Sequence, residues 1–325
     1  MRMQLTHTEM LLGIEADIDS ALALDLIPGD CPLTTLCSGE QIPAAFCELG
    51  KGENKLERII SLLEALVEKL LAEGNIDFKT TPVFWLLPEL TVQGAQPLIH
   101  WASVIKERFP GLFIHPKSQF FPFGRSAFMM SVDPMEALFE QQTVNQVCVI
   151  AVDSLFHDIE NLAFDNCCLT AESGNGLIPS EGVIVTCISP AQSGIKVLFN
   201  ETESATEIQR TQAVESLFYK MTTVLNDNPS ERNIDTFYAP GNGLENTISP
   251  WLNAYIRLAS YVDKRTQLKQ TAMFTGELGC VGGLYNFLHI YHAYQNQSLS
   301  GVTLQLEISD VLYQAVNLYS WSGKD

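Results

Sequence analysis

The chain has 325 residues, of which 46% are hydrophobic and 18% charged. This composition supports one large core, or two closely packed halves, and excludes a disordered chain. The formal net charge of -19 would repel a phosphate backbone or an anionic membrane over most of the surface, so neither nucleic acid nor a membrane is an expected partner.

The first half of the chain alternates between helical and strand-like segments. Apolar residues recur at helical spacing from Leu56 to Leu70, whereas continuous apolar runs indicate buried strands. The predicted elements, in chain order, are a helix over 56–70, a strand over 82–87, a helix over 98–109, a strand over 112–114, a turn at 123–125, a helix over 126–140 and a strand over 146–152.

The second half repeats this alternation, and no Pro/Ser-rich linker or charge run divides the chain. We predict a single α/β domain over 1–325, with an N-terminal half at 1–165 and a C-terminal half at 166–325. The elements predicted in the second half are a β-hairpin of strands 182–188 and 194–199, a helix containing Val214 to Met221, a strand over 234–238, helices over 250–261 and 283–294, and an antiparallel pair over 302–307 and 312–318.

The termini and cysteines give no sign of export or of metal binding. Residues 1–7 have no apolar segment after their single charge, and the chain has no apolar run of about 18 residues, which predicts a cytoplasmic protein. The eight cysteines form no CxxC pair. They are therefore expected to be buried thiols, and neither a metal nor a cofactor is expected.

Three segments together resemble the β-ketoacyl synthases of the thiolase-like superfamily. Residues 126–155 resemble the helix and strand that follow the active-site cysteine, 179–185 resemble the "SEGA" segment, and 275–283 resemble the "tGHxxGAAG" loop. The resemblance implies a layered αβαβα fold with two similar halves. It also implies a dimer built around the strand at 146–152.

The same resemblance assigns positions to the catalytic groups. The family's cysteine, at the start of a buried helix, falls on Ser126 or, one residue earlier, on Arg125. Its two histidines fall on Pro240 and Glu277, and its Gly-rich turn near the C-terminus falls on 308–313, which contain no glycine. The pocket residues implied by these alignments are Arg125, Phe128, Asn242, Gly279 and Ser309.

These replacements argue against Claisen condensation. A serine without an adjacent base is a much poorer nucleophile than a thiolate. Pro240 has no side-chain hydrogen bond to offer, and an anionic Glu277 would repel a developing enolate. We therefore predict a catalytically degenerate ketosynthase-like protein that acts as a binding or structural subunit. The expected partners are a second copy of the chain or an active ketosynthase, with an acyl group or an acyl carrier protein as candidate ligands.

Two other functions remain open at this point. Ser126 with Glu277 as its base would give an acyltransferase or hydrolase, although a serine that starts a helix is first of all an N-cap. A purely protein-binding scaffold would instead have its site filled by side chains such as Phe128, Met129 and Leu312. Separately, His289 and His292 could converge on a metal with Glu277, but a hydrogen-bonded core histidine is the preferred interpretation.

Overall fold

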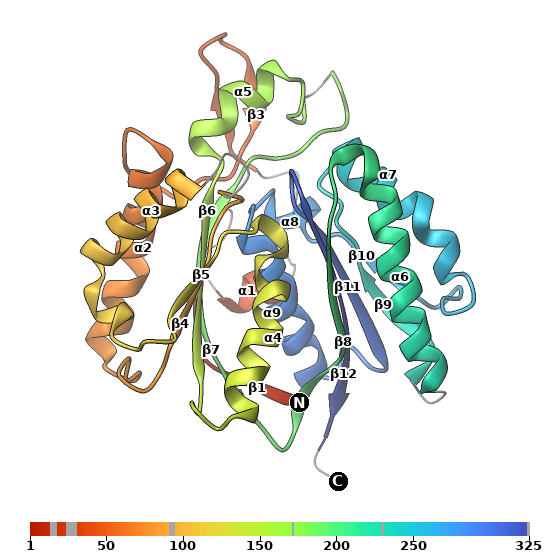
Figure 1. Ribbon diagram of the computed structural model, residues 1–325. Helices are drawn as coiled ribbons and strands as arrows, with labels where there is room; N and C mark the ends of the chain where they lie inside the picture. Colours follow the sequence, from red (N-terminus) through yellow and green to blue (C-terminus); the bar gives the residue numbers. More distant parts are fainter. Residues whose placement is uncertain (14–17, 24–30, 91–94, 171, 229–230, 324–325) are drawn as a thin grey trace.

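The computed structural model describes residues 1–13, 18–23, 31–90, 95–170, 172–228 and 231–323. Five layers are visible in Figure 1: two outer layers of helices, two halves of a twisted sheet, and a central pair of helices between the halves. The layered αβαβα architecture is therefore confirmed. No described helix is both long enough and apolar enough to cross a membrane.

The strands of the described residues form one ten-stranded sheet and a separate two-stranded sheet. The first half of the large sheet consists, in spatial order, of β5 (Gln119–Phe121), β4 (Val83–Leu86), β6 (Val147–Ser154), β7 (Glu181–Pro190) and β1 (Arg2–Leu12). The second half continues with β8 (Gly194–Ser204), β12 (Tyr313–Ser322), β11 (Val302–Ile308), β9 (Ile234–Tyr238) and β10 (Gln267–Lys269). Between the halves, β1 pairs with β8 at two positions only, Arg2 with Lys196 and Met3 with Ile195.

The two halves of the sheet have the same topology. In each half the strands lie in the order third, second, fourth, fifth, first, counted along the chain. In each half two neighbouring pairs are parallel and the next two antiparallel. Because β7 completes the first set, the repeat boundary falls between Pro190 and Gly194, later than the division expected at residue 165.

The helices of each half occupy matching layers. The outer layers consist of α2 (Lys55–Glu73) and α3 (Ala95–Arg108) on the first half, and of α6 (Arg210–Asp227) and α7 (Glu245–Ala254) on the second. The central layer consists of α4 (Ala127–Glu140) and α9 (Val281–Gln295). The shorter elements are α1 (Ile18–Ala23), α5 (Ile159–Phe164), α8 (Ala272–Thr275) and the small sheet of β2 (Leu33–Thr35) and β3 (Gln41–Pro43).

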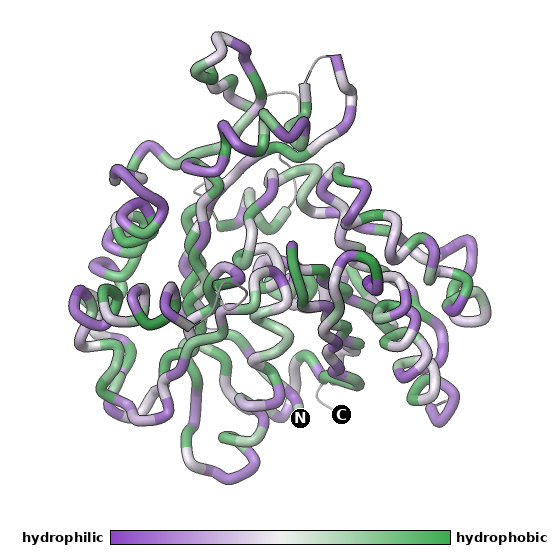
Figure 2. The backbone as a smooth tube through the Cα atoms, turned by 45° about the horizontal axis from the view of Figure 1, so that its top comes forward, coloured by the Kyte–Doolittle hydropathy of each residue, from purple (hydrophilic) through white to green (hydrophobic). Residues whose placement is uncertain are grey.

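Burial explains why these segments differ in sequence. Every residue of β6 is buried because helices cover both faces of the sheet, and α9 is apolar all round because it lies between the two halves. Helix α2 has one polar face and begins at Asn54, whose side chain accepts a hydrogen bond from the Glu57 N–H. In Figure 2 the strands are mainly green, whereas purple residues gather on the peripheral loops and outer helices.

Most elements predicted from the sequence are confirmed, but three expectations are wrong. Strands β7 and β8 do not form a hairpin, because β1 lies between them. Residues 112–114 are not a strand: Pro110 begins the 3-10 turn η2 (Pro110–Phe113) there, and β5 starts only at Gln119. Strand β6 pairs with β4 on one side and β7 on the other, so it has no free edge for a dimer contact.

Candidate functional site

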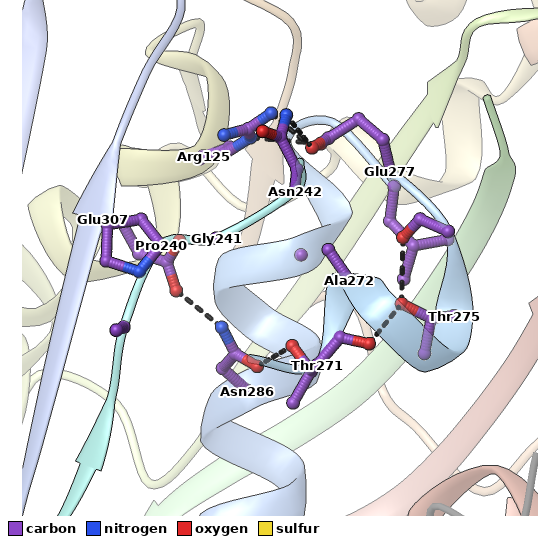
Figure 3. Close-up of a pocket in the computed structure, with 14 residues that line it drawn as sticks. Arg125, Pro240, Gly241, Asn242, Thr271, Ala272, Thr275, Glu277, Asn286 and Glu307 are labelled. Atoms are coloured by element: carbon purple, nitrogen blue, oxygen red, sulfur yellow. Dashed lines mark hydrogen bonds and ion pairs between the residues drawn. The ribbon is translucent and has the colours of Figure 1, made fainter. Parts of the chain in front are cut away.

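Two adjoining cavities lie where the central helices begin, and Arg125 and Glu277 line both. The larger cavity has a volume of about 400 Å³ and is open to solvent between the two halves. The smaller one, drawn in Figure 3, offers only about 30 Å³, enough for roughly one or two water molecules. Ionic groups of the larger cavity are Lys55, Glu89, Arg125, Asp153, Asp158, Glu277 and Asp310. Polar groups of the smaller one are Arg125, Asn242, Thr271, Thr275, Glu277, Asn286 and Glu307.

The positions of Arg125 and Glu277 follow from the repeated topology. Gly124, with φ of 61°, turns the chain from β5 into the 3-10 turn η3 (Gly124–Ser126), which leads directly into α4. Glu277 lies in the corresponding loop of the second half, just before α9. The fold therefore brings two side chains of opposite charge together from equivalent places.

Arg125 and Glu277 form a buried bidentate ion pair. Nε of Arg125 donates to Oε1 of Glu277 over 2.9 Å, and Nη2 donates to Oε2. Both side chains are less than a tenth exposed. Burial alone would lower the pKa of Arg125, but the neighbouring carboxylates, Glu277 above all, raise it. The guanidinium is therefore permanently charged.

Further donors complete the environment of the Glu277 carboxylate, as Figure 3 shows in part. Nδ2 of Asn242 donates to Oε2 over 2.8 Å, and the N–H of Gly279 donates to Oε1 over 2.8 Å. Asn242 is itself held by Thr247, whose hydroxyl donates to Oδ1 over 2.7 Å. With two oxygens bound by four donors, Glu277 has no free position from which to act as a base.

Glu307 is the second buried carboxylate of the site. Its Oε1 accepts hydrogen bonds from Nδ2 of Asn286 over 2.7 Å and from Nε2 of Gln305 over 2.9 Å. Burial raises the pKa of Glu307 to about 7, although these two donors and Arg125 oppose the shift. Near neutral pH this side chain is divided between its neutral and ionised forms.

Ionic side chains line one side of the larger cavity, near the start of α9. Nζ of Lys55 lies 3.1 Å from Oδ1 of Asp153 and 2.8 Å from Oδ2 of Asp158. Burial lowers the pKa of Lys55, but the two aspartates outweigh it and hold the pKa above its usual value. Oδ2 of Asp153 also accepts the N–H of Cys280 over 3.0 Å. Asp153 thus ties the end of β6 to the start of α9.

Ser126 does not face either cavity. Its hydroxyl lies 3.0 Å from Oγ of Ser309 and 3.2 Å from the carbonyl oxygen of Tyr313, and its N–H donates to Oγ of Ser309 over 3.0 Å. Within the described residues, neither an imidazole nor a carboxylate hydrogen-bonds this hydroxyl. The structure pairs Ser126 with Ser309, and pairs Glu277 with Arg125 instead.

The other residues singled out from the sequence lie in different environments. Pro240 and Asn242 line the smaller cavity, and Gly279 lines the larger one. Phe128 lines neither, because its ring packs on Phe287 between the central helices, with centroids 4.5 Å apart. Among the described residues, no group of three His, Cys, Asp or Glu side chains is arranged to hold a metal.

The environment of His289 agrees with the preferred interpretation of a core histidine. Its Nδ1 hydrogen-bonds the hydroxyl of Tyr238 over 2.5 Å. Burial, assisted by the charges of Lys269 and His292, lowers the pKa of His289 to about 3. The imidazole is therefore neutral and occupied by a structural hydrogen bond.

The sequence interpretation missed Glu307, Asn286 and Lys55. Glu307 and Gln305 alternate with Leu304 and Leu306 in β11, which resembles an ordinary half-exposed strand. Here both faces of the strand are covered, so the polar positions are buried as well. In a layered α/β protein, helices cover both faces of the sheet, so a carboxylate within a strand is expected to be buried. This reasoning could have identified Glu307 from the sequence.

The sequence matches no protein-family model, and no curated protein is similar to it. Solved structures, however, match over the whole chain. The ishigamide ketosynthase/chain length factor has a TM-score of 0.67 at 12% identity, covering 99% of this chain and 100% of that chain. This chain has the ketosynthase fold.

Two further structures with the ketosynthase fold illustrate the range of matches. A ketosynthase solved in complex with its chain length factor, from Xenorhabdus doucetiae, has a TM-score of 0.66 at 10% identity, covering 99% of this chain and 98% of that chain. The oxazolomycin ketosynthase domain of Streptomyces albus has a TM-score of 0.73 at 10% identity and covers 100% of this chain and 76% of that domain. At these identities the likeness establishes the fold alone.

Proposed function

We propose that this chain is a non-condensing subunit with the ketosynthase fold that pairs with an active ketosynthase. The observation that carries the proposal is the buried Arg125–Glu277 pair at the starts of the two central helices. A guanidinium stays protonated and has no lone pair with which to attack a thioester carbonyl. Of the two positions to which the resemblance assigns a thiolate, Arg125 is a cation bound to a carboxylate, and Ser126 is a buried hydroxyl held by Ser309.

The surroundings of the pair support the same function. Pro240, at the position assigned to the first histidine, lines the smaller cavity and has no side-chain hydrogen-bonding group. Glu277, at the position of the second, is saturated by Arg125, Asn242 and Gly279. Neither position assigned to a histidine is therefore free to activate a nucleophile or to donate a hydrogen bond to an enolate.

The partner is proposed on two grounds. Several proteins of the same fold are described as a ketosynthase with a chain length factor. In addition, no described strand pairs with the outer side of β5, so this edge of the sheet is available to a partner strand. An acyl group is a candidate ligand of the larger cavity, and a cytoplasmic location is part of the proposal.

The competing function, an acyltransferase or hydrolase that uses Ser126, has less support. Such an enzyme needs a base within hydrogen-bonding reach of the hydroxyl and an open path to it. Ser126 is fully buried, and its hydroxyl contacts Ser309 and backbone carbonyls.

A labelling experiment tests the absence of acyl-enzyme chemistry. The purified protein is incubated with acyl-coenzyme A and acyl-carrier thioesters, and intact mass is measured beside an active ketosynthase as a positive control. We expect no adduct on this chain and full labelling of the control. If wild type and Cys280→Ala form an adduct but Ser126→Ala does not, the proposal is wrong and the protein is a serine-dependent acyltransferase.

Pairing is tested by co-expression with a tagged ketosynthase from the same organism. The expected result is a stable 1:1 complex on size-exclusion chromatography with light scattering. If every ketosynthase of that organism elutes separately from this chain, the proposed pairing is wrong. The result of the labelling experiment would be unaffected.

A further inference from the structure

Two buried cysteines face each other in the middle of the large sheet. Cys148 of β6 lies directly opposite Cys187 of β7 in the antiparallel ladder, and both side chains are completely buried. Within the described residues, the other six cysteines lie outside the strands of the large sheet. Directly opposite residues point to the same face of a sheet, so these two thiols share one environment.

The backbone hydrogen bonds show which kind of cross-strand pair this is. The N–H of Cys148 donates to the carbonyl oxygen of Pro82 over 2.9 Å, on the β4 side of β6. The N–H and C=O of one strand residue point to the same side, so Cys148 shares no ladder hydrogen bond with Cys187. In such a non-hydrogen-bonded pair the Cα atoms lie about 4.5 Å apart, within the roughly 4.4–6.8 Å that a disulfide spans. An S–S bond therefore fits here without displacement of either strand.

The two thiols already contact each other. They hydrogen-bond each other, and this hydrogen bond, followed by burial, raises the pKa of Cys148 well above its ordinary value. Both lie in the cluster of buried apolar side chains beneath α2, together with Ile59 and Leu62 of that helix. A thiol that stays protonated and away from solvent reacts slowly. The pair is therefore protected from oxidants in the folded protein.

The chain between the two cysteines forms part of the wall of the larger cavity. It leaves β6, forms α5 and returns as β7, and Asp153, Leu155, Asp158 and Leu177 are among its residues that line the cavity. A covalent bond between the two strands would close this segment into a loop at its base. Because such a bond restricts the unfolded chain more than the folded one, it favours the folded state.

We propose that Cys148 and Cys187 are the site of a disulfide that forms while the chain folds, by exchange with a low-molecular-weight disulfide such as oxidised glutathione. The thiolate of one cysteine attacks that disulfide, forms a mixed disulfide and releases one thiolate. The second cysteine attacks the mixed disulfide, forms the S–S bond between the strands and releases the other thiolate. The oxidant thus takes up two electrons, and the protons of the two cysteine thiols end on its two released sulfurs.

Folding then fixes the oxidation state of the pair. Once β6 and β7 are paired and covered by α2, neither the thiols nor the disulfide is accessible to exchange. A chain that folds in a reducing compartment keeps both thiols, which is the state of the structure. A chain that folds in oxidising conditions keeps the disulfide. Folded molecules would therefore differ at this site according to the conditions in which they were made.

Refolding of the full chain tests the assignment. Reduced protein unfolded in urea is diluted into buffer with oxidised glutathione, and native reduced protein is kept in the same buffer for the same time. The fraction of native size is isolated by size-exclusion chromatography, free thiols are alkylated in denaturant, and peptides are mapped by mass spectrometry. We expect a peptide that joins Cys148 to Cys187 in the refolded sample, and at least about tenfold less of it in the native sample.

One variant and one matched control accompany the wild type. Cys148→Ala should refold without the cross-link, whereas Cys168→Ala, which removes another buried thiol outside the large sheet, should keep it. The cross-linked wild type should also unfold at a higher urea concentration than the same protein refolded with a reductant. This last comparison uses wild type alone, so it does not depend on the folding of Cys148→Ala.

Three results would overturn the proposal. Refolded protein of native size that carries both cysteines as alkylated thiols would show that the disulfide does not form. Unfolding of the cross-linked protein at a lower urea concentration than the reduced protein would show that the sheet does not accept the bond. Equal cross-linking of the native and refolded samples would show that burial does not protect the pair. None of these results bears on acyl-adduct formation or on pairing with a ketosynthase.

Discussion

Arg125 and Glu277 form a buried ion pair that joins the two halves of the molecule. Arg125 lies just before the central helix of the first half, and Glu277 just before that of the second. Removing two charges from water costs several kcal/mol, so such a pair specifies an arrangement more than it stabilises one. Within the described residues the pair has its own set of neutral donors, Asn242 and the Gly279 N–H, on the carboxylate side. The two halves are thus held in register at the site by opposite charges.

Removing one member of the pair should therefore cost more than neutralising both. We expect Arg125→Met to lower the free energy of unfolding by about 3–5 kcal/mol, because Glu277 is left buried without a cation. Arg125→Met/Glu277→Gln should recover at least half of that loss, since no unpaired charge is left buried and the amide oxygen still accepts from either Asn242 or the Gly279 N–H. Urea denaturation of wild type, both single variants and the double variant measures this coupling, and purely additive losses would refute it.

Glu307 should make stability depend on pH. Its pKa is raised from 4.5 to about 7 in the folded protein, so between these values the folded state keeps a proton that the unfolded state has lost. Raising the pH through this window therefore favours unfolding. Relative to Glu307→Gln, wild type should lose about 2–3 kcal/mol of stability between about pH 5 and about pH 8.

The comparison uses urea denaturation of both proteins at about one-unit steps across this pH range. In the Glu307→Gln variant the amide keeps the oxygen that Asn286 and Gln305 bind, so the local hydrogen bonds are retained. A difference in stability that does not change with pH would mean that Glu307 does not titrate in this range.

For individual residues, the sequence predicted part of the site. Pro240, Glu277 and Asn242 come together as expected, because each follows a recognisable strand or precedes a recognisable helix. The choice between Ser126 and Arg125 could not be made, since they are neighbours in one 3-10 turn and only the turn geometry decides which side chain faces the cavities. Glu307 was missed because its burial depends on how the central helices pack over β11, which places Asn286 of α9 and Arg125 beside the carboxylate.

Among the elements, the loop before α9 leaves no room for a side chain at Gly279. Gly279 has φ of 58°, and a Cβ there would lie 2.1 Å from Oδ2 of Asp153. We expect Gly279→Ala to destabilise the protein by about 2–4 kcal/mol, from backbone strain together with displacement of the Asp153 carboxylate. Gly282, in the first turn of α9, has open space around its Cβ position, so Gly282→Ala is the matched control and should change stability by less than about 1 kcal/mol. Equal thermal midpoints for the two variants would contradict this account of the loop.

Helices and strands with a clear local pattern of apolar residues were predicted well from the sequence. The pairing of strands with one another was not. The helix from Lys55 and the buried strand β6 carry their own periodicity or apolar run. The false hairpin between β7 and β8 arose because short connections usually join paired strands, whereas here β1 lies between them. Pairing between residues far apart in the chain leaves no mark in a local window, as Met3 beside Pro190 illustrates.

The two halves of the molecule share one central core. The largest cluster of buried side chains includes residues of α4 and α9 together with strands from both halves. Such sharing predicts cooperative unfolding of the complete chain. Trp85 lies in the first half and Trp251 in the second, each in a separate outer cluster, so the two side chains report on opposite sides of the molecule.

We expect both tryptophans to report the same transition. Two variants, each with three of the four tryptophans replaced by phenylalanine, would retain only Trp85 or only Trp251. Within each variant, the fluorescence midpoint in urea should coincide with the midpoint from circular dichroism. A Trp85 transition well separated from that of the backbone would indicate that the first half unfolds on its own.

The position of β1 has a consequence for synthesis of the chain. Its residues leave the ribosome before those of every other described strand, but they lie in the middle of the sheet beside β7 and β8, whose residues 181–204 are translated much later. Until then β1, with Met3 and Met10 destined for full burial, has no strand to pair with. At about 5–20 residues per second, that interval lasts roughly 10 to 40 seconds. Over this time we expect a chaperone to bind the exposed apolar residues of the nascent β1 segment. Slowing translation between residues 12 and 181 should therefore increase aggregation more than slowing it after residue 204.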